Sequence, residues 1–114
     1  YGSGHQTRTF CYITDAIEGF LRVISEGLSG ETYNIGNSEP ETSMLDLVKI
    51  LEKIQSKSIP YNLVDYPVSY PADEPNRRAP DISKASTQLG YKPKVSLEEG
   101  LKRFFNWAET NYSK

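Results

Sequence analysis

Apolar residues recur at helical spacing in three stretches of the chain. The first covers residues 15–27, where Asp15 could cap the helix. The second follows residues 41–43. The third runs over 96–111 and starts at a capping box, in which Ser96 and the glutamate three residues later bond each other's backbone amides. The first helix has Ile17, Phe20, Leu21, Ile24 and Leu28 on one face. The second is expected to bury Leu45, Val48, Leu51 and Ile54, and the third to point Leu97, Leu101, Phe104, Phe105 and Ala108 inward.

Three shorter segments, residues 9–13, 32–35 and 59–64, have the β-branched and aromatic composition of strands. A short helix is predicted over 83–89, because a glycine follows it directly and can end it. Residues 66–80 hold four prolines and no periodic pattern, which predicts a long loop of the kind that is often functional. Helices and strands that alternate in 114 residues predict one mixed α/β domain.

Composition excludes several classes of protein. A net charge of −2 and a pI of about 5.4 are unlike the basic surface of a nucleic-acid binder, and they disfavour an anionic membrane surface. No apolar run approaches the length of a membrane span. The single cysteine, Cys11, excludes an internal disulfide and indicates a reducing compartment such as the cytoplasm. We therefore expect a cytoplasmic protein that contacts neither nucleic acid nor membrane.

The chain lacks the residues of most catalytic sites. One histidine and one cysteine cannot form a metal-ligand cluster. His5 lies on a glycine-rich loop and is expected to be solvated, while Cys11 is expected to be a small buried apolar residue of a strand. Gly2 and Gly4 lack the third glycine and the preceding strand of a dinucleotide fingerprint. We expect no catalytic, cofactor-binding or metal-binding residue in this chain.

Two loops nevertheless carry arginine beside residues that stiffen or open the backbone. They are residues 1–8, with Gly2 and Gly4, and residues 73–82, with two prolines. Guanidinium groups suit a bidentate anion such as a diphosphate. The two loops therefore predict a site for a phosphorylated small molecule, and two solvated surface loops remain the alternative.

Four segments in order carry a family resemblance: Tyr-Gly-Ser-Gly-His-Gln-Thr-Arg-Thr-Phe-Cys-Tyr-Ile-Thr-Asp at 1–15, Tyr-Asn-Ile-Gly-Asn at 33–37, the stretch around Arg-Arg-Ala-Pro-Asp-Ile at 74–85, and Leu-Gly-Tyr-Lys-Pro-Lys-Val-Ser at 89–96 with the Leu-Glu-Glu-Gly-Leu that follows. Together they resemble the C-terminal part of the extended short-chain dehydrogenase/reductases that act on nucleotide sugars, the NAD-dependent epimerase/dehydratase family. The resemblance covers essentially the whole chain.

The resemblance implies a Rossmann NAD domain followed by a smaller nucleotide-sugar domain. The glycine fingerprint and the catalytic Tyr-x-x-x-Lys pair of the family lie in the NAD domain, and both are absent from this sequence. We therefore expect residues 1–114 to be the C-terminal substrate-binding portion of a longer, homodimeric parent whose missing N-terminal domain binds NAD, and to be inactive alone. Residues 15–36 would pack on that NAD domain, which predicts an exposed apolar patch at Ile17, Phe20, Leu21 and Ile24, self-association through this face, or an altered packing of it.

The resemblance also implies roles for individual residues. It places Arg8 near the substrate diphosphate or ribose, and Arg78 on the diphosphate beside the reacting sugar. Asp81 matches a position that can accept a hydrogen bond from the ribose, although capping the helix that follows is an equally open role. Gln6 and Tyr1 are candidates for contact with the nucleotide.

The family chemistry begins with transient hydride transfer from the sugar C4 to NAD, which gives a 4-keto sugar. Epimerisation, dehydration or decarboxylation can follow. Thr9, where many epimerases and dehydratases have Asp, and the pattern of residues 75–85 favour UDP-glucuronate decarboxylase. A nucleotide-sugar 4-epimerase, a 4,6-dehydratase, and a non-catalytic nucleotide-sugar-binding or interaction module remain alternatives. Arg77 matches a variable position and is expected to be solvated.

Overall fold

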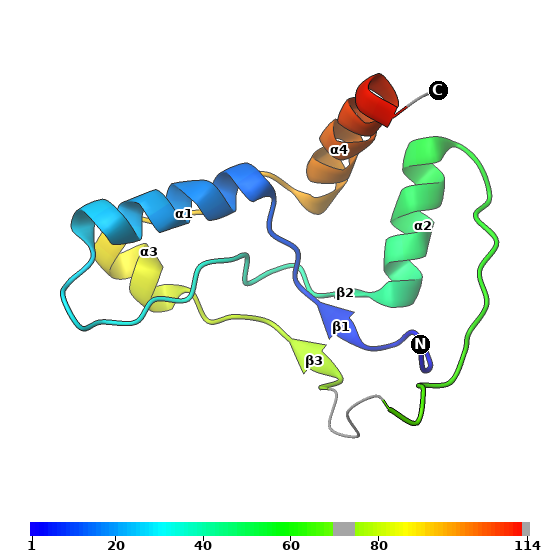
Figure 1. Cartoon of the computed structure of the whole chain (residues 1–114), viewed down its shortest axis with the longest axis horizontal. Helices are drawn as coiled ribbons and strands as arrows, with labels where there is room; N and C mark the ends of the chain where they lie inside the picture. The colour runs from blue at the N-terminus through cyan, green and yellow to red at the C-terminus, as the bar shows by residue number, and fades with distance from the viewer. Residues whose placement is uncertain (70–74, 113–114) are drawn as a thin grey trace.

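The computed structural model describes residues 1–69 and 75–112, which form the mixed α/β arrangement that the sequence predicts (Figure 1). The elements in chain order are β1 (Thr7–Arg8), α1 (Ile13–Glu26), β2 (Thr42–Ser43), α2 (Met44–Gln55), β3 (Arg77–Arg78), α3 (Ser83–Leu89) and α4 (Leu97–Tyr112). Helices α1 and α3 pack together at one side of the molecule and α2 and α4 at the other, with the small sheet below and between them (Figure 1).

The sheet has the strand order β2-β1-β3. Strand β1 runs antiparallel to β2 and parallel to β3, with Thr7 opposite Arg77 and Arg8 opposite Arg78. Backbone hydrogen bonds from Thr7 N to Asn76 O (2.8 Å) and from Thr9 N to Arg78 O (3.2 Å) fix this parallel pairing. The two arginine loops of the sequence are thereby joined as neighbouring strands.

The most buried apolar residues lie between α1 and α3. They are Ala85 and Leu89 of α3 and Tyr91, which follows α3. Gly19 on α1 makes room for Tyr91 and Ile35, because a Cβ there would collide with their side-chain atoms. The described part of the chain therefore has its best-packed core at the α1–α3 contact.

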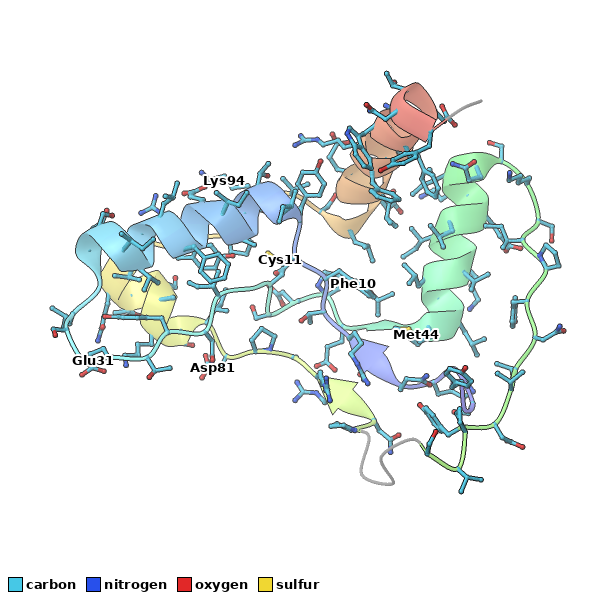
Figure 2. All side chains as sticks on the ribbon, in the orientation of Figure 1. Phe10, Cys11, Glu31, Met44, Asp81 and Lys94 are labelled. Carbon is cyan, nitrogen blue, oxygen red and sulfur yellow. The ribbon has the colours of Figure 1, made fainter. Side chains whose placement is uncertain are left out.

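Asp15 has a different role from the predicted helix cap. The N-cap of α1 is Tyr12, and Asp15 lies in the first turn of the helix with only 4% of its surface exposed. Its carboxylate accepts hydrogen bonds from the backbone amides of Lys94 (2.9 Å) and Val95 (2.8 Å). Lys94 accordingly lies alongside α1 (Figure 2). Asp15 thus ties the segment after α3 to the start of α1.

Helices α2 and α4 form the second packed pair, and both were predicted. The Ser43 hydroxyl caps α2 by accepting from Asp46 N at 3.0 Å. Ser96 makes its half of the expected capping box, accepting from Glu99 N at 3.3 Å, while the Glu99 carboxylate pairs with Arg103. Phe104, which was expected to point inward, is half exposed.

The strands predicted over 9–13, 32–35 and 59–64 are wrong, since none of these segments is a strand in the structure. Residues 12 and 13 instead lead directly into α1. Residues 32–34 run beside α3, where side chains of Lys84, Tyr33 and Asn34 make the contacts. High β propensity describes how a side chain fits a pleated surface, and it produces a strand only where a neighbouring strand is available.

The outer face of α1 is uncovered. Ile17, Phe20 and Leu21 are at least half exposed, and Ile24 is 81% exposed. The radius of gyration, 16.9 Å, exceeds the ~13 Å expected for a compact chain of this length. The predicted exposed apolar patch is confirmed.

Among residues 1–69 and 75–112, none of the helices is long and apolar enough to cross a membrane.

Candidate functional site

The pairing of β1 with β3 brings Arg8 and Arg78 together. Residues opposite each other on neighbouring strands project to the same face of a sheet, so the Arg8 and Arg78 side chains start from the same side. Both residues line an open pocket of about 510 Å³, and the rest of its lining is Thr9, Arg77, Ala79 and Pro80. The structure thus joins into one site the two arginines that the sequence placed 70 positions apart.

The two arginines differ in their surroundings. Arg8 is half-buried on the central strand, and its Nη1 donates to the Thr7 carbonyl at 2.8 Å. Arg78 is exposed on the edge strand. Guanidinium groups cannot lose their protons at ordinary pH, and they donate to phosphate oxygens in pairs. The chemistry that this pocket offers is therefore anion binding, without proton transfer from either arginine.

Arg77 is exposed, as expected, and its guanidinium also forms an ion pair with Glu41. Its Nε lies 2.9 Å from each carboxylate oxygen of Glu41, and its Nη2 donates to the same group. The Thr7 hydroxyl donates to Glu41 as well, at 3.0 Å. The Arg77 hydrogen bonds are the main reason that the pKa of Glu41 is lowered from its ordinary value. Glu41 was missed because no local pattern marks a partner 36 residues away.

Asp81 makes the contacts of a residue that begins a helix. Its Oδ1 accepts from the backbone amide of Ser83, the first residue of α3, at 2.8 Å. Hydrogen bonds from the Ser83 hydroxyl and amide lower the pKa of Asp81. Asp81 lies just ahead of α3 (Figure 2), and the lining of the arginine pocket ends at Pro80. Its contact with a ribose stays a prediction.

Gln6 and Tyr1 lie together on the segment that leads into β1. The Gln6 side-chain amide donates to the Tyr1 carbonyl at 3.0 Å. The Tyr1 ring stacks on Tyr66 with a centroid separation of 6.0 Å. Neither residue belongs to the lining of the arginine pocket. The structure therefore pairs these two candidates with each other, and their contact with a nucleotide stays a prediction.

Cys11 does not belong to a strand, contrary to the prediction. It lies near the buried Tyr91. The thiol is half-buried, 3.6 Å from the Tyr91 hydroxyl, and that hydroxyl donates to the Gly36 carbonyl at 2.9 Å. Burial, followed by the contact with Cys11, raises the pKa of Tyr91 far above its ordinary value. A tyrosine that stays protonated and bonded to a backbone carbonyl has a packing role. Phe10 and Cys11 also border a small apolar pocket of about 260 Å³ beside α4.

The described residues form no metal-ligand group, and the Gly2–Gly4 loop is unlike a dinucleotide-binding loop. Across residues 1–69 and 75–112, His, Cys, Asp and Glu form no group that could hold a metal ion. Gly2 and Gly4 have positive φ angles of 67° and 76°, but a Cβ on them would lie 2.7 Å from Tyr66 and 2.8 Å from Leu45. This loop is already filled, and it leads into β1 and not into the helix N-terminus on which a pyrophosphate rests.

Comparison with known proteins agrees with this geometry. The model of the GDP-mannose 4,6 dehydratase family matches residues 1–104. A human dTDP-D-glucose 4,6-dehydratase is 39% identical over 98% of this chain and 32% of its own length. UDP-glucuronic acid decarboxylase 1 of Arabidopsis thaliana is 39% identical over 90% of this chain and 22% of its own length. The crystal structure of UDP-glucuronic acid 4-epimerase from Bacillus cereus with UDP-glucuronic acid and NAD has a TM-score of 0.84 and 40% identity, covering 98% of this chain and 35% of the epimerase.

The fold is that of the C-terminal portion of an extended short-chain dehydrogenase/reductase, as the sequence predicted. The chain belongs to the GDP-mannose 4,6-dehydratase family, and its structural neighbours are NAD-dependent nucleotide-sugar epimerases and dehydratases. It spans about a third or less of the length of these relatives.

Proposed function

We propose that this chain forms the diphosphate-binding part of an NAD-dependent enzyme that modifies nucleotide sugars. The observation that carries the proposal is the register of β1 and β3, which sets Arg8 opposite Arg78 in one open pocket. A nucleoside diphosphate sugar carries two adjacent negative phosphates. Two guanidinium groups on neighbouring strands can each donate two hydrogen bonds to them.

The rest of the substrate would extend from the diphosphate in two directions. The nucleotide would lie toward Gln6 and Tyr1 at the start of β1, or toward Asp81 at the far end of β3. The sugar would face residues outside this chain, since the Tyr-x-x-x-Lys pair is absent from the sequence. We also place NAD outside these residues, because the Gly2–Gly4 loop does not fit a dinucleotide.

The reaction we favour is decarboxylation of UDP-glucuronate. Thr9, next to Arg8 in the pocket lining, and the Pro75-to-Ala85 pattern favour it. The 39% identity to the Arabidopsis decarboxylase also supports it. A 4-epimerase and a 4,6-dehydratase are the alternatives, because the epimerase from Bacillus cereus and the human dehydratase are equally similar to this chain.

The uncovered face of α1 supports the further proposal that residues 15–36 pack on an NAD domain. Four large apolar side chains on one helix face need a partner to leave water. The same face also supports the alternative from another class, a non-catalytic nucleotide-sugar-binding or interaction module. Cys11, unpaired in this structure, suits the reducing cytoplasm that we propose for the protein.

The test uses the complete natural polypeptide that contains this chain. Its intact mass is measured first, and a value well above 12.9 kDa is expected. The protein is then incubated with NAD and, in separate reactions, UDP-glucuronic acid or dTDP-glucose. Release of CO₂ from UDP-glucuronic acid supports the decarboxylase, a C4 epimer of it supports the epimerase, and a 4-keto-6-deoxy product from dTDP-glucose supports the dehydratase. UDP binding without any conversion would replace the enzyme proposal with the binding module.

A further inference from the structure

We propose that Glu41 is a positioning residue for the substrate diphosphate, acting through Arg77 to hold Arg8 and Arg78 side by side. The inference rests on the proposed function, since it takes Arg8 and Arg78 as the groups that bind the diphosphate. Glu41 itself does not line the arginine pocket, whereas Arg77 is part of its lining.

The contacts of Glu41 and the pair formed by Arg8 and Arg78 start from different faces of the sheet. Side chains alternate along a strand, so Thr7 and Arg77 leave the sheet on the face opposite to Arg8 and Arg78, although the long Arg77 side chain still borders the pocket. On that opposite face the Glu41 carboxylate accepts from the Thr7 hydroxyl at 3.0 Å and from Arg77 Nε at 2.9 Å. Glu41 directly precedes β2, so one carboxylate links the segments of all three strands.

The short strands make this link necessary. The β1–β3 pairing covers two residues on each strand, and register is weakly specified where strands are short and polar. A slip by one residue would turn Arg78 to the other face and take it out of its place opposite Arg8. The fork of the Arg77 guanidinium meets the carboxylate through both Nε and Nη2. This geometry has a single good alignment, and it therefore selects the register that pairs Arg8 with Arg78.

The experiment measures steady-state kinetics and UDP binding of the complete natural polypeptide with its best substrate from the product assay. Glu41→Gln is expected to raise KM and the UDP dissociation constant by roughly three- to tenfold, with kcat within about twofold, because a displaced binding group weakens ground-state and transition-state binding alike. Arg77→Gln is expected to do the same. Glu98→Gln removes a surface ion pair with Lys53 between α2 and α4 and is the matched control, with KM unchanged.

A double variant decides whether the two residues act as one unit. Since Glu41 is proposed to act only through Arg77, Glu41→Gln combined with Arg77→Gln should raise KM no more than either change alone. Multiplied effects would overturn the inference, because they would give each residue its own contact with substrate. An unchanged or lowered KM in Glu41→Gln, with or without a lower melting temperature, would also overturn it.

Arg77→Lys gives a second test should the Glu41 variant fail to fold. Lysine keeps the charge but cannot present a planar fork, so KM should still rise. A wild-type KM in Arg77→Lys would contradict the inference. Arg78→Ala separates this failure from that of the proposed function: if it weakens UDP binding while the Glu41 and Arg77 variants do not, only the positioning role is lost. If Arg78→Ala has no effect, the diphosphate site itself is wrong.

Discussion

The α1–α3 layer and the arginine sheet are held together by different forces. In the layer, the buried Tyr91 and Leu89 and the Asp15 carboxylate fix the helices through apolar packing and hydrogen bonds shielded from water. In the sheet, two-residue strands are joined by a few backbone hydrogen bonds and an exposed ion pair. Burial gives large stabilisation and exposed ion pairs give little. Stability should therefore reside mainly in the layer, and binding in the sheet.

The two sides of helix α1 also differ in how much they contribute to stability. Its inner side carries Asp15 and Gly19, both buried against the segments that flank α3. Its outer side carries Phe20 and Ile24, which contribute little to the stability of this chain while they remain in water. The outer side matters only if a partner covers it.

The largest effect is expected at Tyr91. Tyr91→Ala should cost about 3–5 kcal/mol of unfolding free energy, because it leaves a cavity in the α1–α3 core. Tyr91→Phe keeps the packing and loses the hydroxyl contacts with the Gly36 carbonyl and the Cys11 thiol, so it should cost about 1 kcal/mol. Urea unfolding of the complete polypeptide measures both. Equal losses for the two variants would contradict the packing role.

Asp15 comes next. Asp15→Ala should cost about 2–4 kcal/mol, since it leaves the amides of Lys94 and Val95 without their acceptor. Glu26→Ala, at the exposed end of the same helix, is the control and should change stability by less than about 0.5 kcal/mol. Urea unfolding again provides the comparison, and equal effects at the two positions would remove Asp15 from the core.

A substitution on the outer face of α1 should change the unfolding free energy differently in the 114-residue chain and in the complete polypeptide. Ile24→Ser should alter the unfolding free energy of the 114-residue chain by less than about 0.5 kcal/mol, because the side chain is 81% exposed. In the complete polypeptide the same change should cost about 1.5–3 kcal/mol if an NAD domain buries it. Chemical unfolding of both proteins measures the difference. A negligible cost in both would leave α1 uncovered and contradict the docking proposal.

The smallest effect concerns Glu41 and pH. Its pKa is lowered below the ordinary 4.5, so the ion pair stabilises the fold at pH values above about 4.5 and loses its contribution as pH falls through the folded-state pKa. The stability difference between wild type and Glu41→Gln should therefore be constant from pH 7 to 5 and shrink below 4.5. Unfolding curves across this range measure it, and a difference that grows on acidification would have the wrong sign.

The helices could be predicted because their signals are local. The short helix predicted over 83–89 is α3, and Gly90 ends it in the left-handed conformation with φ of 62°. Ser43 caps α2 within three residues of its partner. The cap predicted at Asp15 failed because its true partners, 79 and 80 residues away, were invisible in the sequence.

The strands could not be predicted because propensity pointed to the wrong segments. The observed strands are polar pairs such as Arg77–Arg78, chosen by long-range pairing and not by composition. The sequence identified Arg8 and Arg78 as candidates through their glycine- and proline-rich loops and the family resemblance. That they face each other, and that Glu41 binds Arg77 behind them, required the structure.

The most direct test of the arginine site is calorimetric titration of UDP into the complete polypeptide and its Arg78→Ala variant. The variant should bind at least about tenfold more weakly, as expected when a charged hydrogen bond worth roughly 1.5–3 kcal/mol is lost. Its unfolding free energy should stay close to that of the wild type, because Arg78 lies in the sheet and stability resides mainly in the α1–α3 layer. Arg103→Ala, which removes a surface pair with Glu99 on α4, should bind UDP normally. Wild-type affinity in Arg78→Ala would contradict the account.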